Sequence, residues 1–345
     1  MIIKKLLEIS ILFLFAKSAM AGKTYNVLNY KARGDGKSDD TNIDGNITAP
    51  NKIWTNERTS LLSFAGINDL NIGGNGTIDG QGAVWWQCNQ CKKPFLLAFD
   101  TCKNLFVGDI RLINSPSKHL TFNKCTNVSV DWIRITAPGD SPNTDGIVMQ
   151  GTQHIQITRS IIGTGDDCIA ILTGSNDIKI NRCTCGPSHG ISIGSLGGGY
   201  TEANVERIHV SNCLIFNSMT GVRIKTWQGG YGYARDITFE AIKVAHVDTP
   251  IVIDQSYMSQ RTLQQKAVAI SNIRFMKIYG TSTQTEAVKI ECSPTSPCTG
   301  VTFSNIALYK EGQDRKVSAI CENAYGTTNG MIVPSLRILR KSKVL

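Results

Sequence analysis

The protein has 345 residues, 41% of them apolar, with 36 lysines and arginines against 27 aspartates and glutamates. The net charge of +9 suits nucleic acid, an anionic membrane surface or an acidic polysaccharide, and it also fits a merely soluble basic surface. After residue 21 no segment is long and apolar enough for a bilayer span of about 20 residues, which argues against a membrane-spanning protein.

The first residues are typical of a secretory signal peptide. Lys4 and Lys5 precede an apolar run, which ends in the small-x-small pattern of residues 19–21. We expect residues 1–21 to be cleaved and 22–345 to form one mature domain, whose net charge falls to +7 because three lysines and one glutamate are lost. A membrane anchor is the alternative, but the apolar run is far too short for one. Secretion favours the acidic polysaccharide over nucleic acid or a membrane as the partner.

Eleven cysteines in an exported chain predict disulfides and neither a metal nor another cofactor. Zinc at Cys88 and Cys91 is a weaker alternative, because no second pair of cysteines or histidines follows at ligand spacing. The odd number leaves at least one thiol unpaired. The local groups are Cys88 with Cys91, Cys168 with Cys183 and Cys185, and Cys292 with Cys298. Predicted N-glycosylation sites, each an Asn-x-Ser/Thr triplet, are Asn46, Asn75 and Asn127.

Short runs with strand composition recur along the mature chain. They alternate apolar with polar residues, and the first five start 23, 27, 23 and 30 residues apart. Strands at this spacing, with almost no amphipathic helix between them, predict an all-β parallel β-helix, in which each coil stacks on the previous one. A β-sandwich or propeller is disfavoured because hairpin turns are scarce. The runs are 104–112, 127–135, 154–162, 177–185, 207–215, 236–244 and 300–308.

A second register of the repeat brings polar residues together. Equivalent residues of stacked coils lie about 4.8 Å apart along a ladder. Asp166 lies one position before such a ladder, and Arg223 and Lys225 lie two apart on the strand after it, so that they share a face. Gapless alignment of 143–149, 165–171, 187–193 and 218–225 places Asp145, Asp167, His189 and Thr220 in one column, at intervals of 22, 22 and 31 residues.

Such a column suits hydrolysis of an acidic sugar polymer. Neighbouring carboxylates raise one another's pKa, so one of them is expected to hold a proton near neutral pH. A protonated acid beside ionised carboxylates is the arrangement that glycosidases use. His189 can hydrogen-bond an aspartate and adjust its pKa, and Arg223 and Lys225 suit a carboxylate on the sugar ring.

Each of these residues also has an ordinary explanation. Asp-Gly and Gly-Asp pairs form turns, and Asx residues often cap the turns of β-solenoids. His189 could be a buried histidine with satisfied hydrogen bonds, and Arg223 with Lys225 a solvated strand face. These explanations do not account for the convergence of the residues at one register on neighbouring coils.

At these residues the sequence closely resembles the polygalacturonases, glycoside hydrolase family 28, particularly those of plants. The resemblance implies a single-stranded right-handed parallel β-helix of the pectin lyase type. It also implies metal-free, inverting hydrolysis of α-1,4-linked galacturonan by a secreted, monomeric enzyme of the plant cell wall, with endo attack favoured over exo. The matching strings are SPNTDG from Ser141, GDDC from Gly165, CGPSHGISIGSLG from Cys185 and GVRIKTWQGG from Gly221.

The resemblance also implies a role for each residue of the site. Asp166 matches the general acid, Asp145 and Asp167 match the pair that holds and activates water, and His189 matches a histidine that supports the acid. The implied substrate contacts are Arg223 and Lys225, which grip the substrate carboxylate, with Asn143 and Tyr257. The implied disulfide joins Cys168 to Cys185.

Three departures accompany the match. After residue 41 relatives have a longer stretch with a helical cap, so we expect a shortened cap that leaves apolar coils exposed. Cys321 lacks its expected partner, and Ser188 replaces the usual glycine before His189. A catalytically impaired, pectin-binding family member therefore remains the alternative function. A β-helix pectate lyase fits less well, since that chemistry needs calcium and an arginine base.

Overall fold

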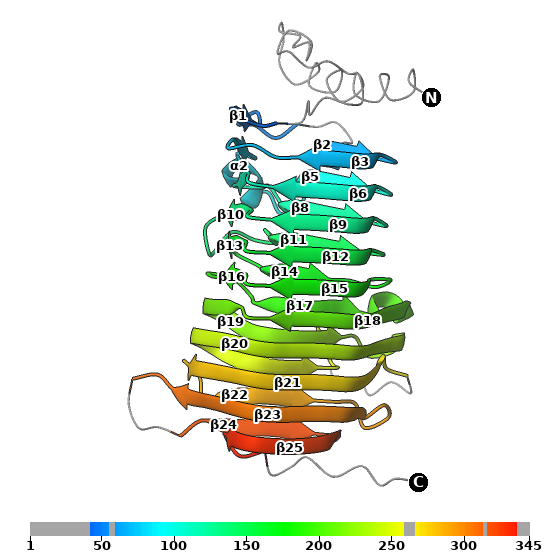
Figure 1. Ribbon diagram of the computed structural model, residues 1–345, viewed down its shortest axis with the longest axis vertical. Helices are drawn as coiled ribbons and strands as arrows, with labels where there is room; N and C mark the ends of the chain where they lie inside the picture. The colour runs from blue at the N-terminus through cyan, green and yellow to red at the C-terminus, as the bar shows by residue number, and fades with distance from the viewer. Residues whose placement is uncertain (1–41, 55–58, 259–265, 313–315, 337–345) are drawn as a thin grey trace, which may run out of the picture.

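The computed structural model describes residues 42–54, 59–258, 266–312 and 316–336, and this part of the chain winds into a right-handed parallel β-helix (Figure 1). Each coil contributes to three walls, in which strands of successive coils pair in parallel. The predicted fold class is confirmed. The expected signal peptide falls on residues 1–21, which lie outside the described residues, and the expected shortening of the cap falls directly after residue 41, where the described residues begin.

Most strands each lie within one of the three walls. The first wall contains β2 (Ser60–Ala65), β5 (Phe95–Asp100), β8 (Leu120–Asn123), β11 (Ile147–Gln150), β14 (Ile169–Ile171), β17 (Ile191–Leu196), β22 (Glu286–Glu291) and β24 (Ser318–Glu322). The second contains β3 (Asn68–Ile72), β6 (Lys103–Gly108), β9 (Thr126–Asp131), β12 (Gln153–Thr158), β15 (Asn176–Asn181), β18 (Glu202–Ser211) and β25 (Ala324–Val333). The third contains β1 (Asn46–Thr48), β4 (Thr77–Asp79), β7 (Arg111–Ile113), β10 (Arg134–Thr136), β13 (Ile161–Gly163) and β16 (Thr184–Cys185).

Longer strands appear in the C-terminal half and pass from one wall to the next. Such strands are β19 (Leu214–Thr226), β20 (Tyr231–Asp254), β21 (Ala269–Ser282) and β23 (Cys298–Lys310). β20, for example, pairs with β18 in the second wall and with β19 in the third and the first. Two short helical turns, α2 (Ala83–Trp86) and η3 (Gly198–Tyr200), lie in connections. No helix among the described residues has the length and apolarity of a membrane span.

The early predicted runs are two strands each, not one. In the run 104–112, Asp109 has a φ of 57° and turns the chain from β6 into β7. Trp132 and Arg159, with φ of 52° and 50°, do the same in the next two coils. The left-handed conformation redirects the backbone, so one run of alternating apolar and polar residues forms two strands that lie in different walls.

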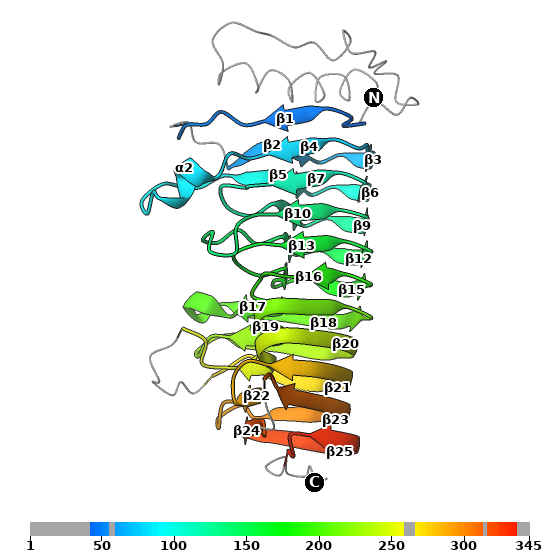
Figure 2. The ribbon, with the colours of Figure 1, turned by 90° about the vertical axis from the view of Figure 1, so that its left-hand side faces the viewer.

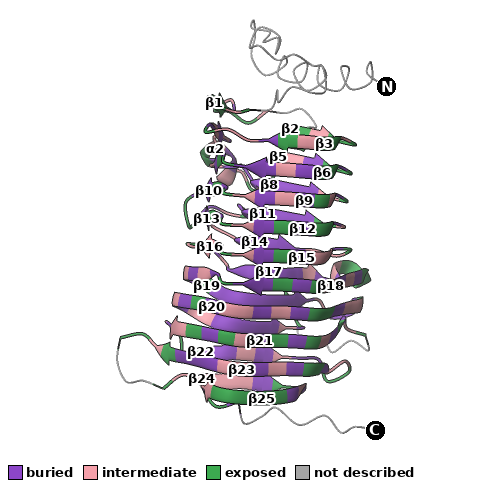
Figure 3. Ribbon diagram, viewed as in Figure 1, coloured by how far each residue is buried: buried purple, intermediate pink, exposed green. Residues whose placement is uncertain are grey.

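Buried residues recur along the strands of successive coils (Figure 3), and their apolar side chains form one continuous core. In the first wall Phe99 packs between Phe64 and Phe122, with ring centroids 5.3 Å apart on both sides. Phe99 and Phe122 are buried, whereas Phe64, in the first described coil, is half-buried. This burial against neighbouring coils supplies most of the stability of a solenoid.

The connections from the third wall to the first wall position the candidate site. They join β10 to β11, β13 to β14 and β16 to β17, and they lie on the same side of the stack as α2 (Figure 2). Each ends where a strand of the first wall begins. Residues at these ends therefore lie side by side in the middle of the stack.

Candidate active site

The register of the first wall confirms the predicted column. Ile147 pairs with Ile169, Ile169 with Ile191, and Ile191 with Val222. The residues two positions before these four are therefore equivalent: Asp145, Asp167, His189 and Thr220.

Backbone hydrogen bonds fix the turns that carry the column. The N–H of His189 donates to the Asp166 carbonyl at 2.8 Å, and that of Gly146 donates to the Asp167 carbonyl at 2.9 Å. Gly190 follows His189 with a φ of 86°, and a Cβ there would lie 2.2 Å from the Thr220 carbonyl oxygen. Only glycine fits so close to the next coil, so the position of His189 just before β17 is fixed.

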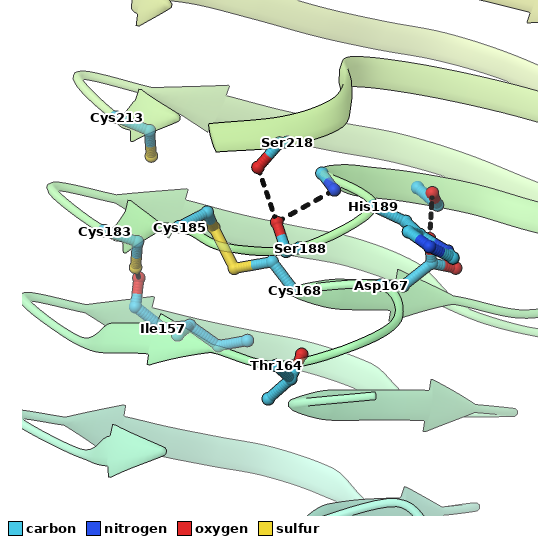
Figure 4. Close-up of a disulfide and its surroundings, with 12 residues drawn as sticks. Ile157, Thr164, Asp167, Cys168, Cys183, Cys185, Ser188, His189, Cys213 and Ser218 are labelled. Atoms are coloured by element: carbon cyan, nitrogen blue, oxygen red, sulfur yellow. Dashed lines mark hydrogen bonds between the residues drawn. A yellow bond between two sulfur atoms is a disulfide. The ribbon is translucent and has the colours of Figure 1, made fainter. Parts of the chain in front are cut away.

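A disulfide joins two of the turns that carry the column, as the resemblance implied. Cys168, directly after Asp167, is bonded to Cys185 of the next coil (Figure 4). Beside it, the hydroxyls of Ser188 and Ser218 lie 2.9 Å apart, and Ser188 Oγ accepts the N–H of Gly190 at 3.0 Å. The serine that replaces a family glycine thus has hydrogen-bond partners in the interior.

Asp167 is a buried carboxylate held by two cations. Its Oδ1 accepts hydrogen bonds from Arg223 Nη2 at 2.7 Å and from Ser192 Oγ at 2.8 Å, and its Oδ2 accepts one from Lys225 Nζ at 2.7 Å. The residue is 2% exposed. Both oxygens of this buried carboxylate are therefore hydrogen-bonded, and two of their three donors are cationic side chains.

Asp166 contacts the histidine of the column. Its Oδ1 lies 3.1 Å from His189 Nδ1 and accepts the Asp167 N–H at 2.7 Å. Burial raises the pKa of Asp166, but the hydrogen bonds from His189 and Asp167 and the charge of Lys225 outweigh it and lower the pKa to about 2. The Asp166 side chain, 23% exposed, is more accessible than that of Asp167 at 3%.

Asp145 is the carboxylate that holds a proton most readily. Burial is the main cause, with Asp166 and Asp167 adding negative charge, and together they raise the pKa of Asp145 to about 6 against the opposing charge of Lys118. Lys118 Nζ lies 3.1 Å from Asp145 Oδ1 and forms an ion pair with it. The expectation that one member of the cluster is protonated thus falls on Asp145, while Asp166, the expected acid, is ionised in the free protein.

Arg223 and Lys225 do share a face, but it is not a solvated one. Each residue is 5% exposed, and each bonds to Asp167. Tyr257 joins this group through its ring, whose centroid lies 5.1 Å from Lys225 Nζ. Asn143 is exposed, and its carbonyl accepts hydrogen bonds from Lys118 Nζ at 3.3 Å and Ser117 Oγ at 3.4 Å.

The sequence reasoning missed Lys118 and His119, which belong to the coil before Asp145. The pairing of Leu120 with Ile147 places Lys118 in the column beside Asp145. His119 is fully buried, and burial lowers its pKa to about 4 against hydrogen bonds to the carbonyls of Asp145 and Thr144. Extending the gapless alignment one coil back, to Lys-His-Leu, would have found both residues.

One group of ligand atoms could be considered for a metal. Asp166, Asp167 and His189 each place one such atom within 4.8 Å of the others, the sole group of this kind in the described ranges. Both oxygens of Asp167 already bond to cationic side chains. A metal would have to displace these charges, so the arrangement does not fit one.

The remaining predicted sites lie away from the column. Cys88 is bonded to Cys91 and Cys292 to Cys298, and Cys321 is buried with a free thiol. The predicted glycosylation sites, Asn46 on β1, Asn75 in the β3–β4 turn and Asn127 on β9, are exposed.

With this geometry in place, comparison with known proteins defines the class. The family model described as "Glycosyl hydrolases family 28" matches residues 17–330. The chain belongs to this family, as the sequence motifs indicated.

Curated plant proteins share about two fifths of the aligned residues. A "Polygalacturonase" of Chamaecyparis obtusa is 40% identical over 86% of this chain and 61% of its own length. "Polygalacturonase QRT2" of Arabidopsis thaliana is 42% identical over 82% of this chain and 68% of its own length, and "Polygalacturonase-2" of Solanum lycopersicum is 40% identical over 87% and 68%. The chain thus spans three fifths to two thirds of the length of these relatives.

Solved structures share the fold. An endo-xylogalacturonan hydrolase from Aspergillus tubingensis superposes with a TM-score of 0.74 at 22% identity, covering 84% of this chain and 85% of its own. A polygalacturonase from Erwinia carotovora gives a TM-score of 0.66 at 24% identity, covering 79% and 81%. At these identities the likeness shows the β-helix and nothing finer.

Proposed function

We propose that this protein is a polygalacturonase that hydrolyses α-1,4-galacturonosyl linkages of de-esterified pectin with inversion of configuration. The observation that carries the proposal is the stack of Asp145, Asp167 and His189 with Asp166 beside it, where Arg223 and Lys225 meet the same carboxylate. Membership of family 28 and relatives named polygalacturonase support it.

Each carboxylate has a role that its surroundings support. Asp166, the more accessible of the Asp166–Asp167 pair, donates its proton to the leaving glycosidic oxygen. Asp145 and Asp167 hold a water molecule, which attacks the anomeric carbon from the opposite face and loses its proton to Asp145. One proton leaves the cluster on Asp166 and one returns on Asp145, so the cluster carries the same net charge before and after the reaction.

The reactive form therefore has its proton on Asp166, whereas the free protein prefers it on Asp145. The pKa values of about 6 for Asp145 and about 2 for Asp166 give a cluster with one proton between these two pH values. A minor fraction of that form carries the proton on Asp166. We expect kcat/KM to fall above about pH 6, where the last proton is lost, and below about pH 2, where Asp145 and Asp166 are both protonated.

Arg223 and Lys225 serve both Asp167 and the substrate in this proposal. A guanidinium has five N–H donors and an ammonium three, so each has donors left after bonding to Asp167. The remaining donors orient the galacturonate carboxylate. Tyr257, whose ring centroid lies 5.1 Å from Lys225 Nζ, and Asn143, whose carbonyl binds Lys118, are the further substrate contacts in this proposal. No cofactor enters the reaction.

We further propose endo attack by a secreted monomer of the plant cell wall, with residues 22–345 as the mature chain. The column lies in the middle of the first wall, with β2, β5 and β8 on one side and β20, β22 and β24 on the other. A polymer lying across it extends over coils in both directions, which supports cleavage inside the chain. The positive net charge supports attraction of an acidic polysaccharide.

Incubation of the full chain with de-esterified polygalacturonate tests the proposal. Release of reducing ends together with rapid loss of viscosity is expected for endo hydrolysis, while steady release of monomer would mean exo attack. Binding to the polymer without release of sugar would favour the impaired, pectin-binding alternative. Products that absorb ultraviolet light through a new double bond would mean a lyase.

A further inference from the structure

Lys118 has contacts that the family roles given above do not use. It lies before β8, in register with Asp145 of the next coil, because Leu120 pairs with Ile147. Its Nζ lies 3.1 Å from Asp145 Oδ1 and donates to the Asn143 carbonyl at 3.3 Å. The ammonium is therefore attached at two points to the turn that carries Asp145.

The other charged groups around Asp145 determine how much the Lys118 ammonium affects its carboxylate. Asp166 and Asp167, one coil further on, add negative charge, and Arg223 and Lys225 bond to Asp167. His119 faces the backbone carbonyl of Asp145, and it is neutral above about pH 4 because burial lowers its pKa to that value. Lys118 is thus the cation that contacts the Asp145 carboxylate directly.

We propose that Lys118 is a positioning residue: its ammonium favours the ionised form of Asp145 and so raises the fraction of the cluster that carries its single proton on Asp166. This inference rests on the proposed function. Asp167 is paired with Arg223 and Lys225, Asp166 is paired with His189, and Asp145 is paired with Lys118. Each carboxylate of the site then has a basic side chain of another coil as its partner.

Removal of the ammonium has a pH signature that follows from this role. Without Lys118 the proton binds Asp145 more strongly, by about one pH unit for an adjacent opposite charge. The plot of kcat/KM against pH falls at its two ends, which we call its limbs. Between the two limbs the fraction of the protein that carries its proton on Asp166 falls about tenfold. Above the upper limb the cluster is unprotonated in both proteins, and the rate depends only on the proton affinity of Asp166, so the two rates converge.

The test compares kcat/KM across pH for the wild type, Lys118→Met and Lys118→Arg. We expect Lys118→Met to lose about tenfold at pH 4 to 5, to match the wild type well above the upper limb, and to move that limb up by about one unit. Lys118→Arg should restore the wild-type profile because it restores the charge. Lys179→Met, which removes an exposed lysine of β15 in the second wall, is the matched control and should leave the profile unchanged.

A second readout does not depend on activity. The Asp145 carboxyl is titrated by carbon NMR of protein labelled at the aspartate carboxyl carbons, with its resonance assigned from Asp145→Asn. An upward shift of its pKa in Lys118→Met, reversed in Lys118→Arg, supports the inference even if the wild type does not hydrolyse polygalacturonate. An unchanged Asp145 titration overturns it, as does an equal loss of kcat/KM at every pH or an effect confined to KM.

Discussion

At the scale of single residues, the site separates three aspartates by giving each a different neighbour. Asp167 is buried, and Arg223, Lys225 and Ser192 hydrogen-bond both of its oxygens. Removing one partner from such a group leaves a buried charge short of its compensation, which costs more than an exposed ion pair is worth. The proton that our account assigns to the cluster is therefore exchanged between Asp145 and Asp166, whereas Asp167 is bonded to Arg223 and Lys225.

Asp166→Asn tests the acid directly. The amide has nearly the shape of the carboxyl group but has no acidic proton to give to the leaving oxygen, so we expect loss of roughly 10²- to 10⁴-fold in kcat on polygalacturonate. The fold and the binding of pectin should be largely kept, as measured by circular dichroism and by retention on the polymer. A variant that keeps more than about a tenth of the wild-type rate would remove Asp166 from the acid role.

Lys225→Ala tests recognition of the substrate carboxylate. Asp167 loses one of its two cations in this variant, so some activity is lost on every substrate. On de-esterified substrate a charge-assisted contact of about 1.5 to 3 kcal/mol is lost in addition, roughly ten- to a hundredfold in kcat/KM. The loss measured on highly esterified pectin should be smaller by that factor. Equal losses on both substrates would restrict Lys225 to holding Asp167.

Residue by residue, the column was predictable and its charge pairing was not. Asp145, Asp167 and His189 follow from a gapless alignment because equivalent positions in a β-helix are hydrogen-bonded neighbours. Lys118 was missed because the sequence around it, Ser-Lys-His-Leu, does not resemble the segments aligned from the later coils. The bonds of Arg223 and Lys225 to Asp167 depend on side-chain rotamers and on burial, which periodicity does not report.

At the scale of strands and turns, the sequence predicts spacing better than boundaries. The predicted runs have the correct register, since Val128 of β9 pairs with Leu105 of β6 and Ile155 of β12. Their division into two walls rests on residues with positive φ such as Asp109, Trp132 and Arg159. Trp132 and Arg159 are not residue types that favour a positive φ, so the stacking of coils imposes this conformation on them.

The disulfide between Cys168 and Cys185 should stabilise the catalytic turns measurably. It closes 17 residues of sequence, and Cys168→Ser is expected to lower the free energy of unfolding by about 2 to 4 kcal/mol in chemical denaturation. Cys88→Ser, which opens a bridge over only three residues, is the control with a smaller loss. Peptide mapping without reductant that finds Cys168 and Cys185 as free thiols would contradict the pairing.

The phenylalanine stack in the second wall should respond as a packed core. Phe275 is fully buried, and its ring lies 5.4 Å from that of Phe239 and 5.0 Å from that of Phe303. Phe275→Ala is expected to lower the free energy of unfolding by about 3 to 5 kcal/mol. Tyr309→Ala, on β23 with 53% exposure, is the control and should change it little. Similar losses for both variants would contradict the stacking.

At the scale of the whole molecule, the β-helix turns a repeat in sequence into a continuous wall with the site at its middle. Coils on both sides of the column offer a surface to a polymer, and the net charge of +9 matches an acidic one. The fold was predictable almost entirely, because a solenoid is built from local repeats. Family 28 membership agrees with the motifs that sequence reading singled out.

The central claim is that Asp145, Asp166 and Asp167 hydrolyse galacturonan by a single displacement. Proton NMR of the first products from α-1,4-linked galacturonan measures the configuration of each new reducing end before it equilibrates. The account predicts that the β-anomer forms first, because water attacks from the face opposite the leaving oxygen. First formation of the α-anomer would mean a covalent intermediate and would contradict the roles assigned to the three aspartates.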